Sequence, residues 1–401
     1  MADNDAVILQ SQPIQSSSSS SRPPTKSQPA EEEVEYVEEW TEKSTCSRTV
    51  SSESRDLRQS ESSSDSDDSE ALETSSDRTL PMVSDTTYRE TLMHHNIYIN
   101  SAEPTPGLMA RAKMIVSQPQ AVPDLDSPDV QQIIEQSRLS EAANETSVRD
   151  GLVPVIIPAR RNVPDPRLTV AADQLWCLSI PPPDCGDEEN KYLRQPKPDL
   201  AFGYTRNAFT KDQNTMIRSS MAEFDNSKSY AVPAQGLNFP FLSIEFKSQA
   251  NQGTHFAGQN QAAGAGAIAM NGIIELTKRA FGVEVLDYDE PQFFSVVMDH
   301  ELARINVHWL KAPTQEGQLP DFHLTTLSRH FLDEPDGIQA VYRAIYNILF
   351  YGVDGRLSNI HKALDKYHKV VHGKKAAAGA KKGSKNGAKK VLRKILRKGF
   401  S

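Results

Sequence analysis

The sequence predicts an α/β protein in which a small mixed β-sheet is flanked by helices and lies between disordered N- and C-terminal tails. Over residues 88–372, short apolar runs typical of strands alternate with longer helical patterns. Residues 1–87 are acidic and rich in Ser, whereas 373–401 are basic and contain no acidic residue. Hydrophobic residues make up only 37% of the chain, so one globular domain diluted by two polar tails is expected.

The N-terminal tail is too polar to bury a core. The runs "SSSSS" at Ser16–Ser20 and "SSSDSDDSE" at Ser62–Glu70 are of low complexity, and the serines beside acids are candidate sites for acidophilic kinases. The stretch "EEEVEYVEEW" at Glu31–Trp40 interleaves acids with Val, Tyr and Trp. It is a candidate motif that folds on a protein partner, and a plain solvated tail is the alternative.

Helical patterns begin the globular domain. The first starts at Tyr88 and is followed by β-branched residues. After a Pro-containing loop, 127–158 has helical character, with Ser127 expected at the N-cap and Pro128 at N1. The Pro154–Pro158 region is expected to end this helix.

Strand candidates follow, each bounded by turn residues. They are Asp173–Ile180, Pro198–Tyr204 and Leu242–Ala250. A long polar segment, from Thr205 to about Pro240, separates the last two. A helix with Thr254 as its candidate N-cap comes next.

The C-terminal part of the domain is predicted to hold three strands and two helices. The runs "FFSVVMD" and "ARINVHWL" (Ala303–Leu310) form a β-hairpin, and "FHLTTLSRHFL" forms a further strand. An apolar stripe at helical spacing then begins near Asp336, a candidate cap, and Gly352 is expected to stop it. A second helix with the same pattern runs from Leu357 to Tyr367.

The strand "LSIEFKSQA" carries two opposite charges. Side chains alternate between the faces of a strand, so Leu242, Ile244 and Phe246 share one face and Glu245 and Lys247 share the other. A surface ion pair of little energetic value is the simplest interpretation. An E-x-K triplet alone is a weak signal, because Glu189–Lys191 repeats it in a loop without an apolar strand.

The neighbours of Glu245 favour a metal-binding interpretation. Pro198–Asp199 opens one strand, and the E-x-K triplet lies on another strand just before a helix rich in Gln and small residues. Two carboxylates and the Phe246 carbonyl could hold Mg²⁺, which prefers oxygen ligands, and Mn²⁺ could replace it. Lys247 would orient the attacking water, an arrangement suited to in-line attack on a phosphodiester.

Together, Pro198–Asp199 and Glu245–Phe246–Lys247 resemble the motif of the PD-(D/E)XK nuclease superfamily. The segments "PKPD…FGY" and "PF…E-x-K-S…QNQ" resemble especially an uncharacterised fungal family of nuclease-like domains. The resemblance covers roughly Tyr88 to His372 and implies a restriction-endonuclease-like core. It implies that Asp199 and Glu245 are metal ligands and that Lys247 is the catalytic lysine.

The resemblance also implies further site residues. Superfamily members often place an acid on the first core helix, and Glu145 matches it as a metal ligand, with an ordinary exposed helix Glu as the alternative. Many members carry a Gln on the helix after the lysine, and Gln259 and Gln261 both fit. These two point in different directions on a helix, so at most one should face the site.

The length of the segment between Asp199 and Glu245 leaves one alternative open. It implies an insertion from Thr205 to about Pro240. If this insertion held the partner strand of the E-x-K strand, Asp199 would not belong to the site.

Several other classes of protein are disfavoured by the sequence. The run "GAGAIAMNG" at Gly264–Gly272 lies inside a helical pattern rather than in a turn after a strand, so it fits close helix–sheet packing better than phosphate binding. Three cysteines without a CxxC argue against a disulfide framework or a Cys-based zinc site. No signal peptide and no membrane-spanning apolar run is recognised, so an intracellular protein without membrane association is expected.

The basic C-terminal tail has three interpretations. A nuclear-localisation signal that also serves as a nucleic-acid arm is favoured. An amphipathic membrane helix is the second, because the apolar residues from Val391 to Phe400 fall at helical spacing, and a solvated tail is the third.

The leading expectation for function is therefore a metal-dependent, nuclease-like protein that hydrolyses phosphodiester bonds of DNA or RNA in the nucleus, and in the cytoplasm as a second location. The alternative is a catalytically inactive nuclear module on a nuclease fold, which binds nucleic acid through the basic tail and protein partners through the acidic tail.

Overall fold

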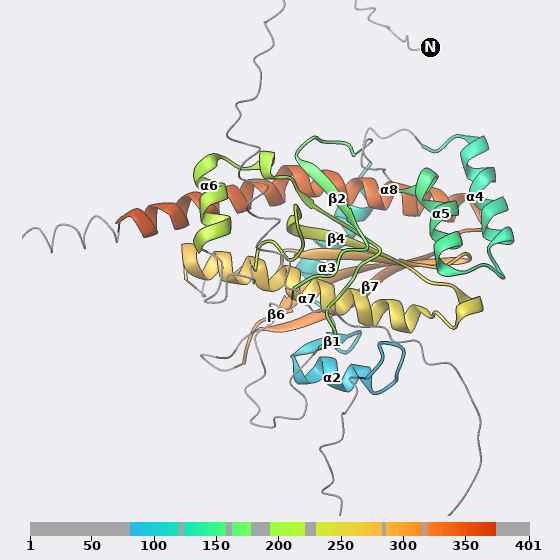
Figure 1. The fold of residues 1–401 in the computed structure, drawn as a ribbon, viewed down its shortest axis with the longest axis horizontal. Coiled ribbons are helices and arrows are strands. Elements are labelled where there is room, and N and C mark those ends of the chain that lie inside the picture. Colours follow the sequence, from blue (N-terminus) through green and yellow to red (C-terminus); the bar gives the residue numbers. More distant parts are fainter. Residues whose placement is uncertain are drawn as a thin grey trace, which may run out of the picture. The chain divides into compact units, whose positions relative to one another are not determined.

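The computed structural model describes residues 81–119, 124–157, 163–177, 193–220, 230–282, 286–314, 318 and 320–373 (Figure 1). The predicted tails fall almost wholly outside these ranges, and so does the second E-x-K copy at Glu189 and Lys191. None of the helices in the described ranges is both long and apolar enough to cross a membrane.

Among the described residues, the strands form one seven-stranded mixed sheet, which confirms the predicted α/β class. Its order is β1-β7-β6-β5-β4-β3-β2. The β4–β5 and β1–β7 pairs are parallel, and the other neighbours are antiparallel. The strands are β1 (Ile97–Ile99), β2 (Leu168–Ala172), β3 (Leu200–Tyr204), β4 (Asn238–Phe246), β5 (Phe293–Met298), β6 (Leu302–Lys311) and β7 (Asp321–Phe331).

Helices cover both faces of this sheet, as predicted. The labelled helices are α2 (Tyr88–His94), α3 (Pro106–Ser117), α4 (Ser127–Leu139), α5 (Glu145–Ile156), α6 (Lys211–Thr215), α7 (His255–Ala280) and α8 (Pro335–Tyr351), and the chain is also helical over 357–373. The short turns are η2 (Arg206–Ala208), η3 (Met216–Ser220), η4 (Gln249–Asn251) and η6 (Gly352–Arg356). Helix α7 connects the parallel strands β4 and β5 and packs on one face, while α3, α4, α5 and α8 cover the other (Figure 1).

Strand β4 lies near the centre of the sheet and is buried along its whole length. It begins at Asn238, before the predicted start at Leu242, and ends at Phe246, so it carries Glu245 while Lys247 directly follows its last residue. Leu242, Ile244 and Phe246 belong to the apolar core shared with α8, as the alternation predicts. The other face of the strand lies under α7, where Gly258 packs against the Lys247 side chain. Both charges are therefore enclosed, and the interpretation as a surface ion pair is wrong for this copy.

The segment predicted as one helix over 127–158 is two helices with separate caps. Asp126, rather than Ser127, caps α4 by accepting from the Asp129 N–H. Asn144 caps α5 through the Ser147 N–H. Helix α5 ends at Ile156, inside the Pro154–Pro158 region as predicted, with Pro154 in its last turn.

Two other elements differ from the prediction in the N-terminal half. No strand forms over 173–177, the described part of the strand expected at Asp173–Ile180. Strand β2 comes before this segment, and the chain turns away at Asp173, which has a left-handed φ of 53°. The expected Pro-containing loop holds helix α3, in which Thr105 caps the Leu108 N–H and Pro106 occupies the first turn.

Helix α8 ends at Tyr351 with Gly352 as its C-cap, as predicted, but Gly352 keeps right-handed helical backbone angles. The chain passes through the π-turn η6 and continues helical over 357–373. A Cβ at Gly352 would lie 2.3 Å from the Phe241 ring, so glycine is needed there for packing rather than for termination. The N-cap of α8 is Glu334 rather than Asp336. The Thr254 cap, the β5–β6 hairpin and strand β7 agree with the predictions.

The glycines of α7 allow the helix to approach the sheet closely. A Cβ at Gly266 would lie 2.1 Å from Nδ1 of the buried His308 on β6. At Gly264, one half-turn away, the nearest atom would be Pro196 Cγ at an ordinary 3.5 Å. The small residues of "GAGAIAMNG" therefore serve helix–sheet packing.

We expect Gly266→Ala to lower the free energy of unfolding by about 1–3 kcal/mol, because the added methyl must displace a buried ring. The matched Gly264→Ala variant should be neutral or up to about 1 kcal/mol more stable, since alanine favours a helix and meets no clash. Urea denaturation followed by circular dichroism measures both. Equal effects of the two substitutions would contradict the close approach at Gly266.

Candidate functional site

Strand pairing brings Asp199 beside the E-x-K triplet. Strand β3 pairs directly with β4, with Leu200 opposite Ile244, and Asp199 immediately precedes β3. The Phe246 N–H donates to Asp199 Oδ2 at 2.7 Å. The described part of the Thr205–Pro240 segment forms helical turns and an isolated bridge, and no strand of it lies between β3 and β4. Asp199 therefore belongs with Glu245 in space.

The Lys247 ammonium lies among oxygen atoms. Nζ donates to Glu145 Oε1 at 2.7 Å and to the Phe246 carbonyl at 2.5 Å, and it lies 3.9 Å from Asp199 Oδ2. Only 5% of the lysine side chain is exposed. Glu145 reaches it from the first turn of α5, where Asn144 fixes the start of the helix. Glu145 is therefore a partner of the site rather than an unattached surface residue.

Glu245 is the most unusual group in the cluster. Its side chain is 1% exposed, and neither carboxylate oxygen has a hydrogen-bond partner among the described residues. Burial raises the pKa of Glu245 well above its ordinary value, and the nearby charge of Asp199 raises it further. The attraction of Lys247 opposes these effects without cancelling them. A buried carboxylate without donors is costly unless a proton or a cation balances its charge.

Burial and neighbouring charges also shift the pKa values of Asp199 and Lys247. Burial raises the pKa of Asp199, while Lys247 and the Phe246 N–H pull it down in part. Burial alone would lower the pKa of Lys247, but the charges of Glu245, Asp199 and Glu145 outweigh it and raise the pKa. Lys247 thus stays protonated and is the main counter-charge of the carboxylates.

Asp173 is a member of the cluster that the sequence did not reveal. Its charge raises the pKa of both Asp199 and Glu245, and its backbone N–H donates to the Asp199 carbonyl at 3.2 Å. Arg149 bonds to it at 2.8 Å. No sequence pattern marks it: the predicted strand starts at Asp173, whereas Asp173 follows the end of β2 with a left-handed φ of 53°.

The two glutamines of α7 differ, as expected. Gln259 is buried and donates to Asn306 Oδ1 at 3.3 Å and to Thr326 Oγ1 at 3.0 Å, so it points toward β6 and β7 rather than into the carboxylate cluster. Gln261 has a buried Oε1 without a hydrogen-bond partner in the described structure and has no recorded contact with the carboxylates. Neither supports a direct catalytic role.

The donor set fits a divalent cation. The oxygens around Nζ of Lys247 come from Glu145, Phe246 and Asp199, so this place already attracts positive charge, and the carboxylate of Glu245 lacks donors. In the ranges that the structure describes, no three His, Cys, Asp or Glu side chains are grouped as a ready-made metal site. Mg²⁺ commonly uses only one or two carboxylates besides other oxygens, so the set remains suitable for it.

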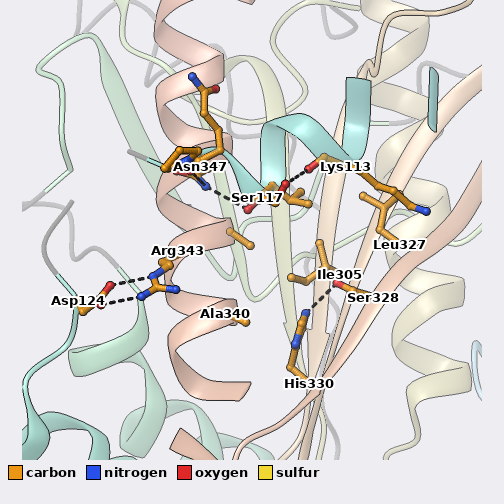
Figure 2. Close-up of a pocket in the computed structure, with 14 residues that line it drawn as sticks. Lys113, Ser117, Asp124, Ile305, Leu327, Ser328, His330, Ala340, Arg343 and Asn347 are labelled. Atoms are coloured by element: carbon orange, nitrogen blue, oxygen red, sulfur yellow. Dashed lines mark hydrogen bonds and ion pairs between the residues drawn. The ribbon is translucent and has the colours of Figure 1, made fainter. Parts of the chain in front are cut away.

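A cavity of about 740 Å³ lies on the face of the sheet that α3 and α8 cover. Figure 2 shows Ala340, Arg343 and Asn347 of α8 opposite strand residues that include Ile305 and His330. Several of its polar groups are already paired with one another. Arg343 holds Asp124 through two bonds of 2.8 and 2.6 Å, and the Asn347 amide donates to two carbonyls at the end of α3. This cavity offers few free groups for recognition, and the Glu245 cluster is the better candidate.

We expect Glu245→Gln to raise the free energy of unfolding of the metal-free protein at neutral pH. Since the folded pKa of Glu245 is raised above its ordinary 4.5, the folded state holds the proton more tightly than the unfolded state. The tighter binding of this proton stabilises the folded state fully at pH values below the ordinary pKa of 4.5. This contribution is lost as the pH rises through the folded pKa of Glu245. Glutamine keeps the shape without the charge, so the advantage of the variant should grow with pH and vanish near about pH 4.

Urea denaturation in a chelating buffer at several pH values measures this difference. Glu141→Gln, at an exposed position, is the control and should follow the wild type. A difference between Glu245→Gln and the wild type that does not change with pH would contradict the raised pKa.

The comparison with known families identifies the domain. The family described as "Domain of unknown function (DUF7924)" matches residues 132–364, a range that contains Glu145, Asp199, Glu245 and Lys247. No curated protein matches the chain. Because the matched range is more than half of the 401 residues, the chain belongs to the DUF7924 family.

Proposed function

We propose that this protein is a metal-dependent, nuclease-like enzyme that hydrolyses phosphodiester bonds of DNA or RNA. The observation that carries the proposal is the buried carboxylate of Glu245, which has no hydrogen-bond donor and lies in the same cluster as Asp199 and Lys247. Structural ion pairs normally satisfy both partners. An unsatisfied carboxylate beside a buried lysine is typical of a site that awaits a ligand.

The residues of the cluster take distinct roles in this proposal. Asp199, Glu245 and the Phe246 carbonyl would hold Mg²⁺ or Mn²⁺, with Glu145 as a further ligand. Bound there, the cation would stabilise the negative charge that develops on the phosphate. Lys247 stays protonated because of the surrounding carboxylates, so it can donate a hydrogen bond to the attacking water or to a phosphate oxygen. Its bond to Glu145 fixes the direction of the ammonium.

The alternative is a catalytically inactive nuclear module that binds nucleic acid or protein partners on the same scaffold. The observation in its favour is that the Lys247 ammonium already balances the cluster, with contacts to Glu145 and Phe246. Such internal pairing could persist in a protein that no longer binds a metal. In that case the two tails would make the contacts with partners.

We expect Lys247→Ala and Glu245→Gln each to reduce cleavage at least about 100-fold, because each removes charge stabilisation in the transition state. The purified full-length protein is incubated with plasmid, single-stranded DNA and RNA in Mg²⁺ or Mn²⁺. Lys211→Ala, at an exposed position on α6, is the control and should cut like the wild type. Cleavage that persists unchanged in both site variants would contradict the assignment, and a wild type that binds without cutting would favour the inactive module.

We also propose that the protein acts in the nucleus and that its basic C-terminal segment directs it there. A tagged chain lacking 373–401 should lose nuclear accumulation, because this segment supplies a run of Lys and Arg without acids. Fluorescence microscopy of the tagged full-length chain provides the reference. A truncated chain that still concentrates in nuclei would show that the signal lies elsewhere.

A further inference from the structure

A second cavity, of about 660 Å³, opens beside the Glu245 cluster at the N-terminal end of α7. Gln249, two residues after Lys247, lines it, and so does Gln259, which follows the Gly258 that packs on Lys247. The Lys247 N–H also bonds to the Met298 carbonyl, one residue before Asp299 in the same lining. The cavity and the candidate catalytic groups are therefore neighbours.

An arginine that lines this cavity lies directly opposite a second arginine on the adjacent strand. Arg304 on β6 lines it and pairs directly with Arg329 on β7. Like charges placed opposite one another destabilise a sheet. Burial lowers the pKa of Arg304, and the charge of Arg329 lowers it further. Arg304 Nε is buried without a hydrogen-bond partner, and no ion pair within the described residues joins either arginine to a carboxylate.

Two further groups place positive charge or positive helix-end dipole at this cavity. Arg89 of α2 lines the cavity, with its guanidinium 4.2 Å from the centre of the Phe256 ring and its Nε bonded to Asn260. The first turn of α7, a helix of 26 residues, forms another part of the lining. The first N–H groups of a helix lack intrahelical partners and attract anions.

The acid among the described lining residues, Asp299, attracts Arg304 and offsets part of its positive charge, but it forms no ion pair with any of the arginines described at this cavity. Its Oδ1 accepts from the backbone of Glu301 and Leu302 at 2.9 and 2.8 Å. Its Oδ2 accepts from Gln249 at 3.0 Å and lies 3.3 Å from His255 Nε2. Burial would raise the pKa of Asp299, but these bonds outweigh it and hold the pKa far below its usual value. Asp299 is thus fully engaged in holding Gln249 and His255.

We propose that this cavity binds a backbone phosphate of the nucleic-acid strand, next to the phosphodiester that lies over Glu245 and Lys247. Arg304 and Arg329 are the phosphate contacts, and the bound anion relieves the repulsion between them. Arg89, held by Phe256 and Asn260, and the first turn of α7 add positive charge for the same strand. These groups position the nucleic-acid strand and take no part in bond cleavage. Their role as substrate contacts rests on the proposed function.

Binding without cleavage tests this assignment. A fluorescent single-stranded hexanucleotide is titrated with the full-length protein in EDTA, at several salt concentrations, and followed by anisotropy. We expect Arg304→Gln and Arg329→Gln each to weaken binding at least about fivefold and to reduce the slope of log K against log salt by about 0.7, the value for one lost contact to a single strand. Arg138→Gln, on the exposed face of α4, is the control and should leave both unchanged.

The stability of the variants separates binding from misfolding. Arg329 is exposed and its loss removes a repulsion, so Arg329→Gln should be at least as stable as the wild type. Arg304→Lys keeps the charge and should keep the salt slope. Unchanged affinity and slope in both glutamine variants would overturn the proposal. A mononucleotide that binds as tightly as the hexanucleotide would also overturn it, because the cavity would then be a mononucleotide site rather than a strand contact.

Glu245→Gln separates this proposal from the proposed activity. In EDTA it should bind the hexanucleotide at least as tightly as the wild type, since it removes a negative charge next to the bound strand. If no protein cuts in Mg²⁺ but the two arginine variants lose affinity and slope, the phosphate site stands and the activity fails. If the wild type cuts and the arginine variants bind and cut equally well, the phosphate site fails and the activity stands.

Discussion

The burial of the Glu245 carboxylate is the constraint on which the rest of the site depends. Strand β4 lies between β3 and β5 and under α7, so a charge on this strand has no access to bulk water. Such a charge must be balanced inside the protein. Lys247, two residues away on the same face, supplies one positive charge, and its own position is fixed by Glu145 and by the Phe246 carbonyl. The carboxylates outnumber the ammonium, and this excess of negative charge supports the proposal that the cluster binds a further cation.

The neighbouring strands and helices supply side chains to the Glu245 cluster or cover it. Strand β3 delivers Asp199, which is held by the Phe246 N–H, and α5 delivers Glu145 from its first turn. Helix α7 closes the face above Lys247, and glycines at Gly258 and Gly266 let it approach the sheet. The same helix begins at the cavity that Arg304 lines. An acidic cluster therefore lies beside a cavity lined by arginines, and this is the charge pattern that the proposed phosphodiester and its metal would require.

The sequence predicts the charged strand and its partner because both depend on local patterns. The alternation around Glu245 and the Pro198–Asp199 strand start are visible within a few residues, and the Thr254 cap is equally local. The remaining features depend on tertiary pairing. The opposition of Arg304 and Arg329 requires the register of β6 on β7, which shifts at a bulge between Ile305 and Asn306. Asp173 joins the cluster only through the pairing of β2 with β3, and no spacing in the sequence indicates that contact.

The central claim is that the Glu245 cluster is a site for a divalent cation. A crystal of the full-length protein grown with Mn²⁺ and measured near the manganese absorption edge tests it most directly. We expect an anomalous peak within coordination distance of the Glu245 and Asp199 carboxylates and the Phe246 carbonyl, and no such peak in Glu245→Gln. A wild-type map with no peak there, while Lys247 still bonds to Glu145 and Phe246, would contradict it.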